Sequence, residues 1–392
     1  MRDPSPVDVL VIGGSLQGLL ILERLVSHGY SCLLVTASEL GDGQTLHSHG
    51  VLNTGFGMAG PEPVNLLRQI VLPDLARRGV RTYGTWGAIA PGLPPGAQGL
   101  ASPDGLELGG GALVRLPERN VDKVDLVSAL GRGAENHILR ANVSGITRSA
   151  DGRVLTVELE PSGVVVAPRT VVVAAGTGSK KLLRRLGAEE GQIKGIKHRP
   201  VQVLCVRGPS GVLPALDVVS PADQLFVASH ERAGERIYLA TPVQFLAPHH
   251  EDLPEDASAE LDQALVDRGW EVLFRLFPPL GSLAGLRFAA YAGYRQDGGD
   301  QPGVPRCEQV ESAPNVIAAL PGGLLGAWPV MMQATGLVEE LTGGRSSGPG
   351  PRLEAGGRVD IGQSYEDSSR VTWTSVPRPG RDIAGAVTAD QS

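Results

Sequence analysis

Cysteine and positive charge are both in short supply in this chain, and each shortage excludes a class of protein. The three cysteines (Cys32, Cys205 and Cys307) lie far apart and match no zinc spacing, so neither a disulfide framework nor a metal site is expected. A net charge of −7 lacks the basic excess of general nucleic-acid binders. No apolar run is long enough to span a membrane, and residues 1–6 do not follow the pattern of a secretory signal. We therefore expect a cytoplasmic protein with no metal, no nucleic-acid partner and no membrane span.

Aromatic residues are scarce as well, at 4%, whereas glycine and proline are abundant, with 53 and 30 of 392 residues. Much of this excess lies in residues 91–111 and after residue 343. The Gly/Ser/Pro-rich run Gly343–Gly350 shows no periodicity and predicts a C-terminal extension without regular structure. The remaining length and the 42% hydrophobic content are sufficient for two closely packed lobes.

The first forty residues follow the order strand, glycine-rich turn, helix, strand. The apolar run Val7–Ile12 predicts a buried parallel strand. The turn Gly13-Gly14-Ser15-Leu16-Gln17-Gly18 follows it, and apolar residues at helical spacing then continue over Leu19–Ser27. Gly29 is placed to end this helix, and Ser31–Thr36 predicts the second strand. This order is the context in which a glycine-rich turn counts as evidence for dinucleotide binding.

The physical reason is that a pyrophosphate must approach the backbone at a helix N-terminus, where unpaired N–H groups and the helix dipole attract an anion. The pattern is imperfect here, because Ser15 replaces the middle glycine and Thr36 stands where an acidic residue normally holds a ribose. From this segment alone, a tight turn without a nucleotide remains the alternative.

Three further segments narrow the interpretation: 41–57 (GDGQTLHSHGVLNTGFG), 171–187 (VVVAAGTGSKKLLRRLG) and 315–341 (NVIAALPGGLLGAWPVMMQATGLVEEL). With the N-terminal turn, their order and separation resemble the FAD-dependent oxidoreductases of the D-amino-acid oxidase type. That family includes glycine, sarcosine and dimethylglycine oxidases, glycerol-3-phosphate dehydrogenase and L-2-hydroxyglutarate dehydrogenase. The resemblance implies an FAD cofactor and an α/β fold. It divides the fold into a Rossmann-like FAD-binding lobe of discontinuous segments and a mostly antiparallel substrate lobe.

The resemblance also implies where the cofactor lies. Val143 matches the residue whose backbone meets the adenine, and Pro321-Gly322-Gly323 opens a helix, expected from about Val330 to Leu341, whose N-terminus faces the flavin. The full set of residues expected at the cofactor is Gly13, Gly14, Ser15, Gln17, Gly18, Thr36, Ala37, Gln44, Thr45, His47, Ser48, His49, Gly50, Val143, Ala175, Gly176, Gly322, Gly323, Leu324, Leu325 and Gly326.

Three interpretations are open for His47. It matches the histidine that bonds covalently to the flavin in dimethylglycine-type members, and a neutral imidazole is a competent nucleophile. Members of the L-2-hydroxyglutarate type resemble the same segment, so a noncovalent role in tuning the flavin or relaying protons is the second interpretation. The third is an ordinary hydrogen-bonded loop histidine. For His49, packing or exposure at the surface is expected in place of catalysis.

Residues 198–300 change character and predict a substrate lobe. His198–Val206, Leu225–Ser229 and Arg236–Thr241 alternate as antiparallel strands do, and 254–277 has helical spacing. The ring nitrogens of His230, His249 and His250 are expected to be solvated.

In the family, an aromatic- and arginine-bearing strand precedes the last FAD segment and faces the substrate. This resemblance makes Arg287, Tyr291 and Arg295 candidates on one face of that strand, with Tyr294 on the other. A guanidinium holds a carboxylate through paired hydrogen bonds. A surface ion pair for an arginine, and simple packing for a tyrosine, are the alternatives.

The sequence thus predicts an FAD-dependent oxidase or dehydrogenase that oxidises a C–N or C–O bond of a small amino acid, secondary amine or 2-hydroxy acid. Oxygen or another acceptor would reoxidise the flavin. The alternatives are a monooxygenase or reductase that uses NAD(P)H, or a degenerate subunit that does no catalysis. The expected ranges are 1–90, 136–197 and 301–342 for the FAD-binding lobe, 91–135 for a connecting loop and substrate-lobe segment, 198–300 for the substrate lobe and 343–392 for the extension.

Overall fold

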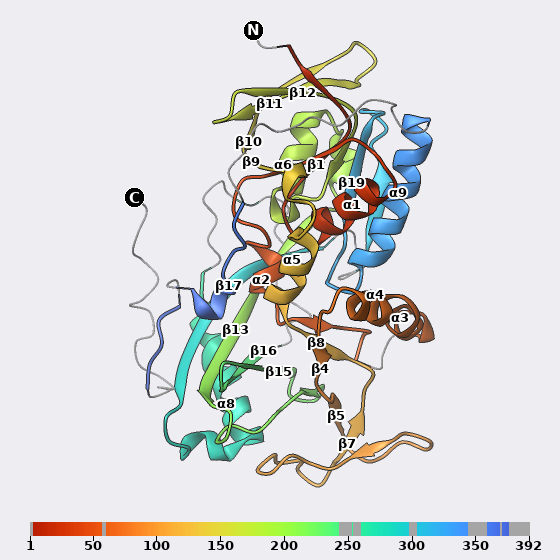
Figure 1. Ribbon diagram of the computed structural model, residues 1–392. Helices are drawn as coiled ribbons and strands as arrows, with labels where there is room; N and C mark the ends of the chain where they lie inside the picture. Colours follow the sequence, from red (N-terminus) through yellow and green to blue (C-terminus); the bar gives the residue numbers. More distant parts are fainter. Residues whose placement is uncertain are drawn as a thin grey trace.

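Two large sheets form the framework of the structure (Figure 1). The computed structural model describes residues 3–56, 60–242, 253, 260–297, 304–343, 359–368 and 371–375. Each of these sheets has eight strands. A third, small sheet has three strands. The mixed α/β class expected from the sequence is confirmed.

The first sheet is parallel at its centre, where strands β1 and β12 pair along their length. One side of β1 is taken by β2 and then β9, while β12 pairs with the β10–β11 hairpin at its start and with β19 at its end. Strand β18 closes the edge beside β19. The strands are β1 (Ser5–Ile12), β2 (Cys32–Thr36), β9 (Ile138–Arg140), β10 (Asn142–Arg148), β11 (Val154–Glu160), β12 (Val164–Val173), β18 (Arg306–Gln309) and β19 (Val316–Leu320).

Helices cover both faces of this sheet, which explains why its central strands are apolar on both sides. The side chains of Val9 and Val11 pack with helices α1, α5 and α9, whereas Leu10 and Ile12 pack on the opposite face with α6. The helices are α1 (Leu16–Ser27), α5 (Lys123–Gly131), α6 (Ser179–Leu186), α7 (Glu190–Ile193) and α9 (Ala327–Thr342). Helix α9 begins three residues before the expected start at Val330.

The second sheet is mostly antiparallel, in the order β17-β13-β16-β15-β14-β5-β7-β6, and helix α8 packs on β13 and β16. Its elements are β5 (Gly87–Ala90), β6 (Gly99–Leu100), β7 (Ala112–Arg115), β13 (Lys197–Pro209), β14 (Val218–Ser220), β15 (Leu225–Arg232), β16 (Glu235–Pro242), α8 (Gln263–Leu276) and β17 (Arg287–Asp297). Strand β5 lies within the range expected for the FAD-binding lobe, yet it joins this second sheet by pairing with β14 and β7. Part of the range expected for helix 254–277 lies outside the described residues, and α8 begins at Gln263 with Asp262 as its cap.

Short elements connect the two sheets. Strands β3 (Val51–Leu52), β4 (Thr82–Tyr83) and β8 (Arg119–Val121) form the small sheet, and α2 (Gln44–His47) precedes it. Helix α3 (Pro61–Leu66), a π-helical turn over Leu67–Val71 and α4 (Leu72–Arg77) follow one another directly.

Part of the C-terminal extension packs on both sheets. This C-terminal segment (residues 359–368 and 371–375) forms one bridge from Ile361 to Leu40 and another from Thr374 to Phe288. The sequence leaves the extension poorly specified, and the structure shows that this segment of it is packed, while residues 344–358 lie outside the described part of the chain. Among the described residues, no helix is long and apolar enough to cross a membrane.

Candidate active site

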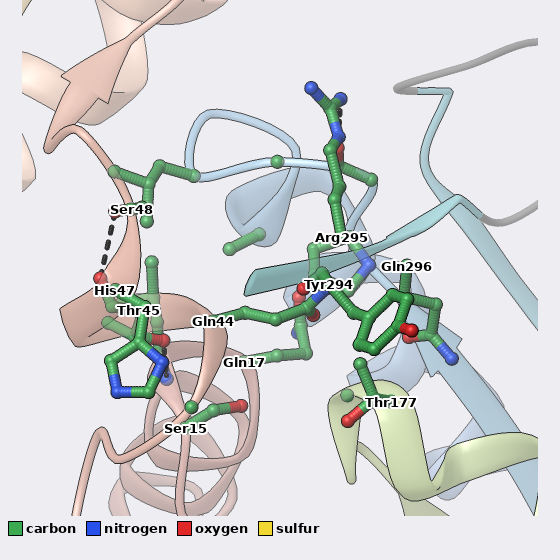
Figure 2. Close-up of a pocket in the computed structure, with 18 of the residues that line it drawn as sticks. Ser15, Gln17, Gln44, Thr45, His47, Ser48, Thr177, Tyr294, Arg295 and Gln296 are labelled. Carbon is green, nitrogen blue, oxygen red and sulfur yellow. Dashed lines mark hydrogen bonds between the residues drawn. The ribbon is translucent and has the colours of Figure 1, made fainter. Parts of the chain in front are cut away.

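A cavity of about 1470 Å³ lies where the two sheets meet. Its wall includes the turn after β1, helix α2, the turns that follow β12 and β19, and strands β13, β15, β16 and β17. This volume exceeds the roughly 300–1,000 Å³ of ordinary ligand pockets, so a large cofactor and a small substrate can share it. Figure 2 shows Gln44 of α2 reaching between Ser15 and Gln17 on one side and Tyr294 and Arg295 of β17 on the other.

The turn after β1 leaves no room for side chains. Gly13 has a φ of +126°, and a Cβ on it would stand 2.2 Å from the Ala174 carbonyl oxygen. A Cβ on Gly14 would meet Thr36 Oγ1 at 2.5 Å. Ser15 is tolerated in the position of the missing glycine, and its hydroxyl donates to the Ala174 carbonyl at 3.4 Å. The backbone therefore forms a close-fitting wall of the cavity at this point.

Two polar features at this turn are suited to bind a ligand. Ser15 is the N-cap of α1 but its side chain makes no capping hydrogen bond, and the first turn of α1 holds no acidic residue. The amide of Gln17, which is 2% exposed and lines the cavity, has no hydrogen-bond partner at either end. Helix α9 also begins at the cavity, with Gly326 as an N-cap that has no side-chain cap. Helix N-termini in this state bind anions readily.

The far end of the cavity is basic. Val143 lines it, and Arg185 of α6 donates to the carbonyls of Val143 and Ser144 at 2.8 and 2.9 Å. Lys181 of the same helix lines the cavity too. Ala175 and Gly176 continue the wall after β12, as the sequence predicts.

The segment around α2 is held from several sides. Thr45 Oγ1 accepts from the backbone N–H of Leu16 at 3.1 Å, and Gln44 Nε2 donates to the Tyr294 carbonyl at 3.1 Å. His47 Nε2 lies 3.5 Å from Asp42 Oδ1 at the cavity wall. The hydroxyl of Tyr291 donates to the His47 carbonyl at 3.1 Å.

A buried ion pair supports the same segment from behind. The ammonium of Lys123 (2% exposed) donates to the carbonyls of Leu46 and Ser48 at 2.9 and 2.7 Å. Its charge is balanced by Glu366 of the C-terminal segment at 3.0 Å. The C-terminal segment therefore helps to fix the backbone on both sides of His47.

The substrate side of the wall carries two arginines from neighbouring strands. Arg199 of β13 and Arg295 of β17 are direct cross-strand partners, so their side chains leave the same face of the sheet, and both line the cavity. Arg295 Nη2 also donates to the Gly322 carbonyl at 2.6 Å, in the turn that precedes α9. Figure 2 shows Arg295 and Tyr294 pointing to opposite sides of β17.

Comparison with known proteins agrees with this geometry. The model of the family described as "FAD dependent oxidoreductase" matches residues 8–330. The chain belongs to the FAD-dependent oxidoreductase family.

Relatives differ in how much of the chain they cover. A protein of Pseudomonas aeruginosa described as a "Probable FAD-dependent oxidoreductase" is 28% identical over 240 residues, which is 53% of this chain and 60% of the relative. The solved structure of an FAD-dependent oxidoreductase from Pseudomonas aeruginosa matches with a TM-score of 0.71 at 21% identity, over 93% of this chain and 98% of the other. An L-amino acid deaminase from Proteus vulgaris (TM-score 0.65, 16% identity, 89% and 93% covered) and a glycine oxidase from Geobacillus kaustophilus (0.63, 17%, 90% and 98%) share the fold.

The residues of this FAD-dependent oxidoreductase fit its cofactor. The glycine turn, the uncapped N-terminus of α1 and the unpartnered Gln17 amide meet at one place in the cavity wall. The charged side chains in the lining are four cations (Lys181, Arg185, Arg199 and Arg295) and two carboxylates (Asp42 and Glu62), a balance that suits a diphosphate.

Most of the predicted cofactor residues line the cavity, but two do not. Gly18 lies behind the turn, where a Cβ would collide with the Gly13 carbonyl oxygen at 1.8 Å, so it serves helix–strand packing. Gly50 faces the carbonyl oxygen of Val121, 2.7 Å from the position of its missing Cβ. Both glycines have a packing role in this structure and neither lines the cavity, so contact of their backbone with the cofactor stays a prediction.

The prediction for Arg287 is corrected too. It shares a face of β17 with Tyr291 and Arg295, but it lies at the opposite end of the strand, roughly 26 Å from Arg295 at about 3.3 Å per residue. There its guanidinium pairs with Glu235 at 2.6 Å and lies over the Trp373 ring of the C-terminal segment. The alternative of a surface ion pair describes Arg287.

Among the histidines outside α2, one differs from expectation. His230 is partly buried and bonded at both ring nitrogens, so the expectation that it is solvated is wrong. His249 and His250 lie outside the described residues. His49 lines the cavity, as expected for the cofactor set, and its ring packs edge-on against Phe226.

Several cavity residues carry no sequence signal of their own. Lys181 and Arg185 lie within the segment 171–187 that carries the family resemblance, and their basic character was the available clue. Gln202, Phe226 and Thr241 belong to alternating strands, where nothing in the sequence separates a cavity position from a core position. In the described part of the chain, no cluster of His, Cys, Asp or Glu has the form of a metal site.

Proposed function

We propose that this enzyme oxidises the C–N or C–O bond of a small carboxylate-bearing substrate, an amino acid, a secondary amino acid or a 2-hydroxy acid. The observation that carries the proposal is the pair of opposed arginines, Arg199 and Arg295, in the wall of a cavity that also contains the glycine turn. Guanidinium groups bind carboxylates through paired, charge-assisted hydrogen bonds. The neighbouring folds of an L-amino acid deaminase and a glycine oxidase support a substrate of this class.

The protein itself then positions the substrate and excludes water from the site. FAD, when bound, supplies the acceptor for the hydride. Arg295, tied to the Gly322 carbonyl at 2.6 Å, orients the carboxylate relative to the turn before α9. Tyr291 holds the His47 carbonyl, and apolar residues such as Phe56 and Phe226 line the rest of the substrate side.

The test is anaerobic reduction of the purified holoenzyme by a panel of D- and L-amino acids, N-methyl amino acids and 2-hydroxy acids, without NAD(P)H. Bleaching of the flavin absorbance by a member of the panel is expected. If the whole panel fails and NADPH is consumed instead, a monooxygenase or reductase is correct. If neither occurs, the chain is a flavoprotein without catalytic activity. Admission of oxygen and assay of hydrogen peroxide then distinguish an oxidase from a dehydrogenase that uses another acceptor.

The three interpretations of His47 remain proposals with a direct test. Acid precipitation of the wild type leaves flavin on the protein only if the bond is covalent. The same treatment of a His47→Ala variant places the bond, because flavin that persists in the variant excludes His47 as the attachment point. If the wild type releases its flavin, pH profiles of reduction in wild type and variant separate a tuning or relay role from a loop histidine.

A further inference from the structure

A directional chain of hydrogen bonds fixes the protonation of His49. Thr241 Oγ1 lies 2.9 Å from the Gln202 carbonyl and 2.6 Å from His49 Nε2. A carbonyl only accepts, so the single proton of the Thr241 hydroxyl goes to Gln202. The hydroxyl must then accept from His49, whose proton therefore lies on Nε2.

A second pair of bonds fixes the backbone of the same residue. His230 Nε2 lies 2.7 Å from the His49 carbonyl and must donate to it. Its Nδ1 then accepts from the hydroxyl of Tyr83 at 2.6 Å. Tyr83, His230, His49, Thr241 and Gln202 thus form one chain in which each proton has a defined place.

The chain leaves one group of His49 unused, the lone pair of Nδ1. This atom makes no hydrogen bond to a described residue, and it is not fully buried. His49 lines the cavity and is partly exposed. The Nδ1 lone pair is therefore accessible from the cavity.

The surroundings keep this nitrogen an acceptor. Burial lowers the pKa of His49 to about 3, and the nearby charges of Lys123 and Arg295 act in the same direction. The imidazole is therefore neutral at physiological pH. Part of its surroundings on the cavity wall is apolar: the ring of Phe226 meets it edge-on at 4.5 Å, and Phe56 lies 5.7 Å from Phe226.

We propose that His49 is a specificity-determining residue, whose Nδ1 accepts a hydrogen bond from an O–H or N–H group on the side chain of the substrate. This inference rests on the proposed function, in which Arg199 and Arg295 hold the carboxylate of the substrate. The substrate class it names is a carboxylate with a mostly apolar side chain that carries one donor. A site built around such an acceptor discriminates against analogues that lack the donor, because the acceptor is then left unpaired.

Matched ligand pairs test the preference in the wild-type holoenzyme. Tyrosine against phenylalanine and threonine against valine, in both enantiomers, differ mainly in one donor, and flavin reduction gives kcat and KM for each. The pair 3-(4-hydroxyphenyl)propanoate and 3-phenylpropanoate has no oxidisable amine, and its binding is read from the flavin spectrum and from thermal stabilisation. We expect about a tenfold preference for the donor-bearing member of at least one pair.

Two variants separate recognition from support. In His49→Asn the amide retains a group near the position of Nδ1 and loses the bond to Thr241. In His49→Gln the amide retains a group near Nε2 and loses the one near Nδ1. We expect the preference for the donor-bearing ligand to survive in His49→Asn and to disappear in His49→Gln, with the change mainly in KM or Kd. If His49 had a purely structural role, the preference would instead survive in His49→Gln and disappear in His49→Asn.

The outcomes distinguish the two proposals. A preference in the propanoate pair without reduction of flavin by any substrate supports the His49 subsite and refutes the proposed oxidation. Reduction of flavin without a preference in any pair overturns the His49 subsite and leaves the oxidation standing. Absence of both binding and reduction overturns both.

Discussion

The cofactor side of the cavity is made mostly of backbone and small residues, whereas the substrate side is made of larger side chains from several strands. On the first side, the glycine turn and the N-termini of α1 and α9 present N–H groups from short, contiguous stretches of sequence. On the second, Arg199, Arg295, Thr241 and Phe226 come from β13, β17, β16 and β15. A site made of backbone depends on the conformation of one turn, while a site made of side chains depends on how distant strands are aligned.

The C-terminal segment reaches both sides. Glu366 pairs with Lys123 behind α2, and Trp373 packs under the guanidinium groups of Arg207 and Arg287 on the second sheet. Substitutions on each side, and in the segment between them, therefore test whether the two sides are as different as the geometry indicates.

The largest effect is expected from Gly13→Val. A side chain here requires a φ of +126° and overlaps the Ala174 carbonyl, where a Cβ would stand at 2.2 Å. The turn must then move, so FAD affinity falls by at least about a hundredfold. The flavin-to-protein absorbance ratio after dialysis measures the loss.

Gly191→Val is the matched control, because nothing lies within 4 Å of a Cβ at that position. It should retain FAD and change stability little. Full flavin occupancy in Gly13→Val would show that the backbone of this turn is not what selects the cofactor.

Glu366→Gln follows in size. The substitution leaves the buried Lys123 ammonium, 2% exposed, without its counter-charge. Breaking such a pair costs about 3 kcal/mol of folding free energy, and the loosened carbonyls of Leu46 and Ser48 should weaken FAD binding as well. Denaturant unfolding and FAD titration measure both effects.

The adjacent residue supplies the control for this pair. Asp367 is 24% exposed and pairs with Arg207 and Arg232 at the surface, so Asp367→Asn should cost less than about 1 kcal/mol. Equal losses of folding free energy in the two variants would mean that the C-terminal segment stabilises the fold only through its surface contacts.

The sequence was informative where chemistry depends on contiguous residues. Gly13, Gly14, Gly322 and Gly323 were predicted because a strand, a tight turn and a helix leave a readable order. Gly18 belongs to the same pattern, and its packing role is the one that the last glycine of such a turn has.

The substrate side was less predictable, for a physical reason. Side-chain alternation gave Arg287 and Arg295 the same face of β17, but it carried no information about where along the strand the cavity lies. The partnership of Arg199 with Arg295 depends on the register between β13 and β17, and the burial of His230 depends on Tyr83 and on the backbone of His49. Register and long-range packing are not written in local periodicity.

Arg295→Lys tests the substrate side directly. Lysine keeps the positive charge but loses the planar pair of N–H donors, so KM for a carboxylate substrate should rise roughly thirtyfold. FAD content should stay unchanged if the two sides are independent. Steady-state kinetics beside the flavin spectrum give both quantities.

The control lies on the same strand. Arg287→Lys removes the same donors at the far end of β17, where Glu235 is the partner, and KM should not change. A rise in KM for Arg287→Lys equal to that for Arg295→Lys would indicate a general disturbance of β17 and not the loss of a carboxylate contact.

The smallest expected effect is a pH dependence of stability that arises at His230, whose imidazole holds the carbonyl of the cavity residue His49. Burial lowers the pKa of His230 to about 4; Lys123 adds to the shift, whereas Glu366, the His49 carbonyl and Asp122 oppose it. The imidazole of His230 takes up a proton near pH 6.5 in the unfolded chain but not in the folded protein. The contribution of His230 to the unfolding free energy is therefore complete above pH 6.5 and is lost as pH falls toward 4. Between pH 7 and pH 6 the loss attributable to His230 is about 0.7 kcal/mol. In His230→Gln this contribution is absent, and its unfolding free energy should fall less steeply over the same interval. Identical slopes for the wild type and the variant would place the acid sensitivity elsewhere.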